Sequence, residues 1–334
     1  MENKPLVSIC MITYAHGPFI ATALESVVMQ KTSFPFELVI GEDDGPDNTR
    51  AICEVYAQQY PDIIRLLPHE KNMGNHPNFI RTLYNCTGKY IALLEGDDYW
   101  TDPYKLQKQV DLMESDPSLA FTFHNVHILE NDDVAGQVYP GDRKNVVTIK
   151  DTLNHDYFQT CSVLFRADLL FAIPRAEAKQ WIFNDITLYC LLLRKSGMRA
   201  QYIPEVMGTY RIHPGGVWSM ANIQKKYTHS QKAEVLLLDR YYQEPELRPL
   251  LAKREMDYYN LFMIETAKAC DWKLMNTCLR QYAYWSMRAA PLKIWRAALP
   301  FAYYVRALLF KNRPKKTMSV TYGEKPKKRK SALS

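Results

Sequence analysis

The sequence Tyr90-Ile91-Ala92-Leu93-Leu94-Glu95-Gly96-Asp97-Asp98 joins a short, mostly apolar run to a cluster of acidic residues. A short apolar run that ends in turn residues is typical of a buried strand. The acids stand at its carboxyl end, where open α/β sheets bind their ligands. Three neighbouring carboxylates repel one another unless a cation lies between them, and Mg²⁺ or Mn²⁺ prefers such oxygen ligands. A solvated acidic turn is the alternative interpretation of this motif taken alone.

The chain around this strand alternates between strand and helix patterns. This alternation predicts an α/β fold with a mostly parallel sheet and helices on both faces. The predicted strands lie at 6–12, 36–40, 63–67 and 90–94, and the predicted helices at 19–30, 49–59 and 77–85. Beyond residue 100 the pattern loosens, and we expect a helix at 105–113, strands at 120–126, 161–165 and 207–211, a polar loop at 131–144 and a helix at 185–195.

The last third of the chain has no strand pattern. Helices are predicted at 223–243, 246–269 and 272–290. We therefore expect a catalytic domain at 1–220, a helical region at 221–310 and a basic, disordered tail at 311–334. The segment 280–310 mixes Trp, Leu and Phe with Lys and Arg, as membrane-surface helices do. The alternative is that these aromatic residues pack back on the protein.

Composition limits the class of protein. Of the 334 residues 47% are hydrophobic, and no apolar run of eighteen residues and no secretory signal is present, so we expect a cytoplasmic chain without a transmembrane helix. The seven cysteines are scattered, which predicts reduced thiols. The net charge of +6 comes from the tail: residues 311–330 hold nine basic residues and one acid, and the remainder carries −2. Such a tail indicates either an anionic partner surface or a solubilising end.

Five motifs in a fixed order resemble those of family 2 glycosyltransferases, inverting enzymes with the Rossmann-like GT-A fold. The resemblance covers roughly residues 5–220 and is greatest to bacterial enzymes that build surface polysaccharides. The motifs are residues 7–14, residues 39–50, residues 72–74 with Asn78, residues 88–100 and residues 210–219, to which Asn184-Asp185 is added. The chain departs from the common pattern at Gly45-Pro46, where many members have Ser-Thr, and at Glu95, where many have Asp.

The resemblance implies a donor site for a nucleotide sugar. Tyr14 matches an aromatic residue that stacks on the base, and Asp43 matches an acid that accepts hydrogen bonds from the base or ribose. A core tyrosine is the alternative for Tyr14. The resemblance implies that eight residues bind the donor: Thr13, Tyr14, Glu42, Asp43, Asn78, Asp97, Asp98 and Arg211.

The resemblance also implies a metal, Mn²⁺ or Mg²⁺, held by Asp97, Asp98 and His213. The metal would bridge the two phosphates and stabilise the departing nucleoside diphosphate. Arg211 would bind phosphate oxygens through its guanidinium group. A surface-loop histidine is the alternative for His213.

Asp185 matches the catalytic base of the family. It would accept the proton of an acceptor hydroxyl during attack on the anomeric carbon, so that a single displacement inverts the centre. An aspartate at the start of an apolar helix also serves as a cap or as a favourable first-turn acid.

The function predicted is transfer of a sugar from a nucleotide-sugar donor, with UDP as the default carrier, to a glycan or lipid-linked acceptor. The enzyme would rest on the inner face of the cytoplasmic membrane through residues 280–330. A metal-dependent nucleotidyl or phosphoryl transferase is a second hypothesis, although the phosphate-binding motifs G-x-x-x-x-G-K-[ST] and G-x-G-x-x-G are absent. A non-catalytic nucleic-acid-binding protein is a third, which the −2 charge of the body disfavours.

Overall fold

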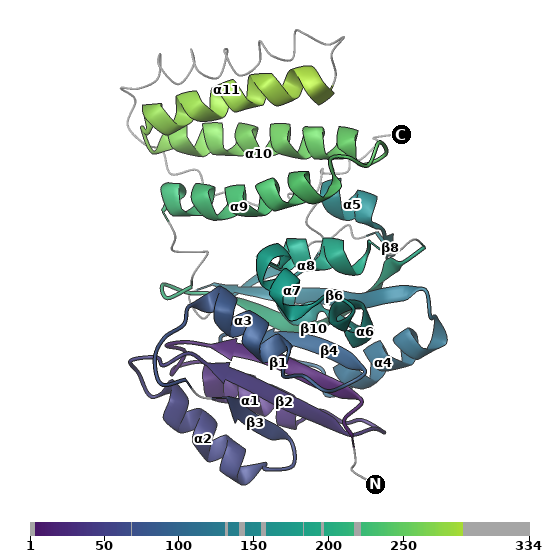
Figure 1. Ribbon diagram of the computed structural model, residues 1–334. Coiled ribbons are helices and arrows are strands. Elements are labelled where there is room, and N and C mark those ends of the chain that lie inside the picture. Colours follow the sequence, from purple (N-terminus) through teal and green to yellow (C-terminus); the bar gives the residue numbers. More distant parts are fainter. Residues whose placement is uncertain are drawn as a thin grey trace, which may run out of the picture.

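The structure is a computed structural model, drawn in Figure 1. It describes residues 4–67, 69–130, 133–139, 144–154, 158–182, 184–194, 197–216 and 222–289, of which 133–139 are described by their backbone. The strands are β1 (Val7–Thr13), β2 (Phe36–Glu42), β3 (Ile64–Leu67), β4 (Tyr90–Glu95), β5 (Tyr99–Trp100), β6 (Leu119–Glu130), β7 (Asp133–Tyr139), β8 (Val146–Val147), β9 (Leu164–Arg166) and β10 (Arg199–Ile212). The helices are α1 (Ile20–Val28), α2 (Thr49–Gln59), α3 (Asn75–Leu83), α4 (Lys105–Ser115), α5 (Ile149–Asn154), α6 (Ala167–Phe171), α7 (Arg175–Trp181), α8 (Asp185–Leu192), α9 (Ile223–Tyr241), α10 (Arg248–Lys268) and α11 (Trp272–Ala289), with a 3₁₀ turn at Thr160–Ser162.

The strands form one sheet in the order β3-β2-β1-β4-β9-β6-β10-β5. Strands β1, β2, β3 and β4 are parallel to one another, and so are β6 and β10. The short strand β9 runs antiparallel to both β4 and β6 and joins the two parallel blocks. The predicted α/β sheet with helices on both faces is therefore confirmed, with antiparallel additions that the prediction lacked.

Strand β4 shows how the sheet separates two cores. Its side chains alternate between the faces, as the pleat requires. Ile91 and Leu93 pack in the core that holds α3 and α8. Ala92 and Leu94 pack in the core that holds α1 and α4. Burial on both faces explains why this strand reads as an uninterrupted apolar run rather than as an alternating one.

Two expectations for the middle of the chain were wrong. The expected polar loop at 131–144 contains β7, which pairs antiparallel with β6 and places Asp133 opposite Glu130. The expected strand at 161–165 is a 3₁₀ turn followed by β9. An added antiparallel strand takes its stability largely from backbone pairing with one neighbour, so its side-chain pattern is a weak signal.

Helices α9, α10 and α11 form a layer stacked beyond α8, on one side of the sheet (Figure 1). Their own core is rich in aromatic residues and includes Tyr258, Phe262 and Trp285. A second cluster joins this layer to α8, where Ile186 and Cys190 meet Leu237. Because α8 packs against the sheet on one side and the helical layer on the other, its residues are apolar on all sides apart from Asp185 and Thr187 in the first turn.

The described part of α11 ends at Ala289. Some of the aromatic residues in the segment 280–310 lie before this point, and the others lie after it. Trp285 is only 9% exposed, and its ring lies 5.8 Å from that of Tyr242. It therefore packs on the protein, contrary to the membrane role expected for it. Leu292, Trp295, Leu299, Phe310 and the basic tail at 311–334 lie outside the described residues. Across the described helices, none combines the length and apolar character that a bilayer crossing requires.

Candidate active site

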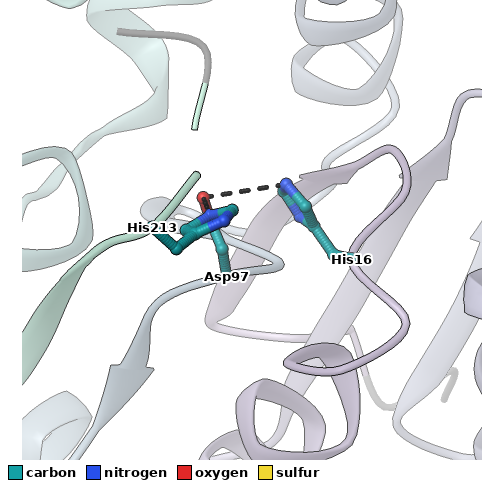
Figure 2. Close-up of side chains that lie close together, drawn as sticks. All are labelled: His16, Asp97 and His213. Atoms are coloured by element: carbon teal, nitrogen blue, oxygen red, sulfur yellow. Dashed lines mark hydrogen bonds and ion pairs between the residues drawn. The ribbon is translucent and has the colours of Figure 1, made fainter. Parts of the chain in front are cut away.

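Three side chains meet beyond the carboxyl ends of β1 and β4: His16, Asp97 and His213 (Figure 2). The Nε2 atom of His213 lies 3.1 Å from Oδ2 of Asp97, and Nε2 of His16 lies 3.7 Å from the same oxygen. One ligand atom from each residue falls within 4.8 Å of the others. The sequence-predicted Asp97 and His213 are thus brought together, and a third residue joins them.

Strand pairing explains this convergence. Since β1 and β4 are neighbouring parallel strands, the loops that follow them leave the same edge of the sheet. A Cβ atom on Gly96 would lie 2.5 Å from Oγ1 of Thr13, so the close approach of these two loops requires glycine. Oγ1 of Thr13 in turn lies 3.2 Å from Nδ1 of His16 and orients that ring.

The pairing of β5 with β10 brings His213, the third residue of the cluster, to this edge of the sheet. Strand β5 follows the acidic turn and pairs with β10, which ends just before His213. The backbone N–H of Arg211 donates to Oδ1 of Asp98 at 2.9 Å, and Nε of Arg211 donates to the carbonyl of Asp97 at 2.9 Å. Asp98 is 2% exposed. The structure therefore does not bring Asp98 into the cluster with His16 and His213. Instead, its carboxylate binds the backbone of β10 and so holds the acidic turn against that strand.

The three acids of the motif differ in charge. Burial raises the pKa of Asp97, but the hydrogen bond from His213 and the neighbouring His16 outweigh it, and the net pKa is lowered. Burial, with the charges of Asp97 and Glu95, holds the pKa of Asp98 well above its usual range. Burial, with Asp97 and Asp185, raises the pKa of Glu95 to about 8. The surroundings thus favour the ionised form of Asp97, whereas burial disfavours the ionised forms of Asp98 and Glu95.

Glu95 connects this motif to Asp185. It follows Ile91 and Leu93 on the face of β4 that is covered by α8, and the charge of Asp185 at the start of α8 acts on it. Asn184 is the N-cap of α8, where its side chain accepts from the backbone N–H of Thr187 at 3.1 Å. Asp185 is a half-buried first-turn acid rather than the cap.

The residues carried over for donor binding lie at the same edge but differ in accessibility. Tyr14 is 46% exposed in the loop after β1. Asp43 is buried, and its two carboxylate oxygens accept the backbone N–H groups of Met73 and Gly74 at 2.8 and 2.9 Å. It therefore holds the loop between β3 and α3.

Glu42 and Asn78 are buried and engaged inside the protein. Glu42 accepts from Nε of Arg50 at 2.6 Å and from the backbone N–H of Gly45 at 2.9 Å. Nδ2 of Asn78 donates to the carbonyl of Gly41 at 2.7 Å. The structure does not bring either side chain to the cluster around Asp97, and both fix the loops that border it.

His16 is the residue that the sequence analysis missed. It lies in the loop after the first strand, and one signal was available: neighbouring parallel strands bring the loops that follow them to one edge of the sheet. Burial lowers the pKa of His16, although the nearby charge of Asp97 opposes the shift. A neutral imidazole is the form that binds metals.

The cluster fits a divalent cation in its donor chemistry. It offers two imidazole nitrogens and one carboxylate oxygen, which are donor types that divalent metal ions accept in proteins. The backbone N–H of Gly215 donates to Nδ1 of His213 at 3.2 Å, so Nε2 donates its proton to Asp97. Coordination through Nε2 would require that proton to leave or move to Nδ1.

Sequence comparisons match the amino-terminal half of the chain to a known family. The sequence model described as Glycosyl transferase family 2 matches residues 8–170. An uncharacterized protein of Mycobacterium tuberculosis, Rv1520, is 32% identical over 221 residues, which are 66% of this chain and 62% of that protein. The chain thus spans less than two thirds of this relative. The putative teichuronic acid biosynthesis glycosyltransferase TuaG of Bacillus subtilis is 27% identical over 63% of this chain and 80% of its own length.

Solved structures show the same fold. Residues 1–349 of Staphylococcus aureus TarS in complex with UDP-GlcNAc align with a TM-score of 0.62 at 17% identity, over 90% of this chain and 87% of that one. The mannosyltransferase PcManGT of Pyrobaculum calidifontis in complex with GDP-Man and Mn²⁺ aligns with a TM-score of 0.56 at 17% identity, over 92% and 87%. The chain therefore contains a glycosyltransferase family 2 domain with the GT-A fold.

Proposed function

We propose that this protein transfers a sugar from a nucleoside diphosphate donor to a hydroxyl of a glycan or lipid-linked acceptor, with inversion at the anomeric carbon. The observation that carries the proposal is the meeting of Asp97 with His16 and His213 at one sheet edge, while Asp185 lies close enough to act on Glu95. In this proposal the first cluster would hold a cation for the diphosphate, and Asp185 would be a separate carboxylate for the proton.

The residues that would hold the metal are His16, Asp97 and His213. A bound Mn²⁺ or Mg²⁺ would neutralise charge on the diphosphate leaving group. Arg211, whose side chain lies beside Asp97, would contribute its guanidinium to phosphate oxygens. Asp98 holds the Arg211 backbone in place and is a positioning residue in this scheme.

The donor nucleotide would lie along the loops after β1 and β2. Tyr14 offers an exposed ring for the base. Thr13 lies next to it in the chain and orients His16. Asp43 retains lone pairs for the base or ribose, whereas Glu42 and Asn78 fix the loop backbone. UDP is the proposed carrier, because TarS, one of the structures with this fold, was solved with UDP-GlcNAc. PcManGT, solved with GDP-Man and Mn²⁺, is the reason to test GDP as well.

Asp185 is the proposed base. The acceptor oxygen forms a bond to the anomeric carbon as the bond from that carbon to the diphosphate oxygen breaks, and Asp185 takes the acceptor proton. The half-buried position at the first turn of α8 suits this role, because the helix amino end favours the ionised carboxylate.

The test is calorimetric titration of UDP and GDP into the protein with Mn²⁺ or with EDTA. Asp97→Asn and His16→Ala should each weaken Mn²⁺-dependent nucleotide binding at least tenfold, since each removes a ligand. Asp62→Asn, an exposed acid next to β3, is the matched control and should bind like wild type. Nucleotide binding that is unaffected by EDTA and by both substitutions would show that the cluster does not hold the metal.

The basic tail is the basis of a proposed location on the inner face of the cytoplasmic membrane. Each basic residue near an anionic leaflet contributes about 1 kcal/mol, and residues 311–330 hold nine. Liposome flotation should recover the full chain with anionic vesicles at low salt. A chain ending at Pro291, which keeps α11, should stay in the soluble fraction. Equal recovery of both chains under every condition would remove this part of the proposal.

A further inference from the structure

One aromatic side chain, that of Phe19, contacts two residues that the proposed function assigns to the donor site. Its ring centroid lies 4.4 Å from that of His213, with an interplanar angle of 55°. The central guanidinium carbon of Arg211 lies 4.8 Å from the centre of the same ring. Phe19 is half-buried in the loop between β1 and α1, whereas Arg211 and His213 lie at the end of β10. Through this ring, the loop after β1 contacts a distant part of the chain.

Hydrogen bonds fix the loop that carries Phe19. The carbonyl of His16 accepts the backbone N–H of Phe19 at 2.8 Å. The backbone N–H of His16 donates to Oγ1 of Thr49, and that of Gly17 donates to Oδ2 of Asp47, each at 2.8 Å. The loop is thus attached to the start of α2 as well as to α1, and it can hold the ring in one position.

The guanidinium group of Arg211 is restrained by a second ring as well. Its central carbon lies 5.3 Å from the centre of the Tyr99 ring, and its Nε donates to the carbonyl of Asp97 at 2.9 Å. A guanidinium group is attracted to the π-system of an aromatic ring and binds phosphate oxygens through its N–H groups. The contacts with Phe19 and Tyr99 are therefore compatible with phosphate binding by Arg211.

The ring of Phe19 also limits the motion of His213. This histidine is 9% exposed, and its Nε2 lies 3.1 Å from Oδ2 of Asp97. An imidazole that ligates a metal must keep its ring in a fixed orientation. A side chain that is already held by packing loses less conformational entropy when its ligand binds. Removing the ring of Phe19 should therefore weaken the binding of any ligand that needs both Arg211 and His213.

We infer that Phe19 is a positioning residue, whose aromatic ring holds Arg211 and His213 ready for a divalent cation and the diphosphate of the donor. The inference rests on the proposed function, because that function assigns the two side chains to this ligand. It adds that the position requires an aromatic ring rather than apolar bulk alone.

The test compares substitutions of Phe19 with and without a ring, in the full chain. Calorimetric titration of UDP in the presence of Mn²⁺ should give a dissociation constant about five- to twentyfold higher for Phe19→Leu than for wild type. Phe19→Tyr keeps the ring and should bind UDP within about twofold of wild type. Electron paramagnetic resonance of free Mn²⁺ should show that Phe19→Leu also binds the ion alone more weakly.

Phe34→Leu is the matched control. It makes the same chemical change at a half-buried phenylalanine that precedes β2, at the amino end of that strand. This variant should bind Mn²⁺ and UDP like wild type. Circular dichroism melting checks that each variant is folded, and Phe19→Met, a second substitution without a ring, replaces Phe19→Leu if the latter is unfolded at the assay temperature.

A double-mutant cycle separates a role through Arg211 from a general effect on the fold. In an Arg211→Ala background, Phe19→Leu should raise the dissociation constant of UDP by less than about half the factor seen in the wild-type background. The reason is that one of the two side chains that Phe19 holds is then missing. An equal factor in the two backgrounds would show that Phe19 does not act through Arg211, and would overturn the inference.

The outcomes separate this inference from the proposed function. A wild-type protein that binds neither Mn²⁺ nor UDP would overturn both together. If the wild type binds both ligands and Phe19→Leu binds them with unchanged affinity, this inference alone is overturned. The same holds if Phe19→Tyr binds as weakly as Phe19→Leu, because the ring would then not be what the position requires.

Discussion

Replacing Glu255 with glutamine should alter how the stability of the protein depends on pH. Burial beside Glu234 raises the pKa of Glu255 from 4.5 to about 8 in the folded protein. An acid whose pKa is raised by folding favours the folded state below its unfolded pKa, and that contribution is lost as pH rises through the folded pKa. The wild-type protein should therefore become less stable between about pH 4.5 and pH 8 on account of this single group.

The size of the effect follows from the shift. Each pKa unit corresponds to about 1.4 kcal/mol, so the shift from 4.5 to about 8 can change the free energy of unfolding by at most about 5 kcal/mol. About 3 kcal/mol of this change falls between pH 5 and pH 8. Glu255→Gln removes the titration and keeps the shape. The free energy of unfolding of the variant, relative to wild type, should thus rise by about 3 kcal/mol from pH 5 to pH 8.

Urea unfolding followed by far-UV circular dichroism at pH 5, 6, 7 and 8 measures this difference. Glu265→Gln makes the same chemical change on the exposed side of α10, where the carboxylate pairs with Lys268, and its pH dependence should match wild type within about 0.5 kcal/mol. Parallel curves for wild type and Glu255→Gln across this range would refute the reasoning, because they would show that Glu255 ionises as readily in the folded as in the unfolded chain.

Three further predictions concern the sheet and its junction with the helical layer. Asp185→Asn should lower turnover by about 10²–10⁴-fold while UDP binding stays within twofold, as single-turnover kinetics and calorimetry can show; near-normal turnover would leave Asp185 a first-turn acid only. Gly88→Ala should destabilise the protein by more than about 2 kcal/mol, since the added Cβ would lie 2.6–2.9 Å from backbone atoms of β1 and β4, and an unchanged melting temperature would contradict that packing. Leu237→Ala should cost about 2–5 kcal/mol in the free energy of unfolding, against a small effect of Val235→Ala, which is 56% exposed on the same helix; equal effects of the two would contradict burial of Leu237 against α8.

Local sequence determined the elements whose side chains follow one clear periodicity. Helix α2 occupies the predicted residues, and β1, β2, β3 and β4 lie within two residues of their predicted ends. The long segments after residue 222, which have no strand pattern, form the three predicted helices of the C-terminal layer. These elements were predictable because apolar spacing alone decides whether a segment buries one stripe of a helix or both faces of a strand.

The spacing of apolar residues within one segment does not predict which distant segments pair with each other. Strand β9 enters the sheet antiparallel between β4 and β6, and β7 adds to β6, although neither has a strong strand pattern. The same holds for α8, whose uniformly apolar sequence predicts burial but not the two partners that bury it. Such contacts depend on which surfaces the rest of the chain leaves uncovered.

Some features of the candidate site also followed from local sequence, and others required the tertiary structure. The sequence placed Asp97 after a buried strand and Asp185 at the start of an apolar helix, because strand and helix ends are marked by local residue types. Only the tertiary structure decided that His16 joins Asp97 and His213, that Asp98 turns to the backbone of Arg211, and that Glu95 faces α8. Each of these depends on which strands are neighbours and on which face of the pleat a side chain leaves, and those are properties of the assembled sheet rather than of any one segment.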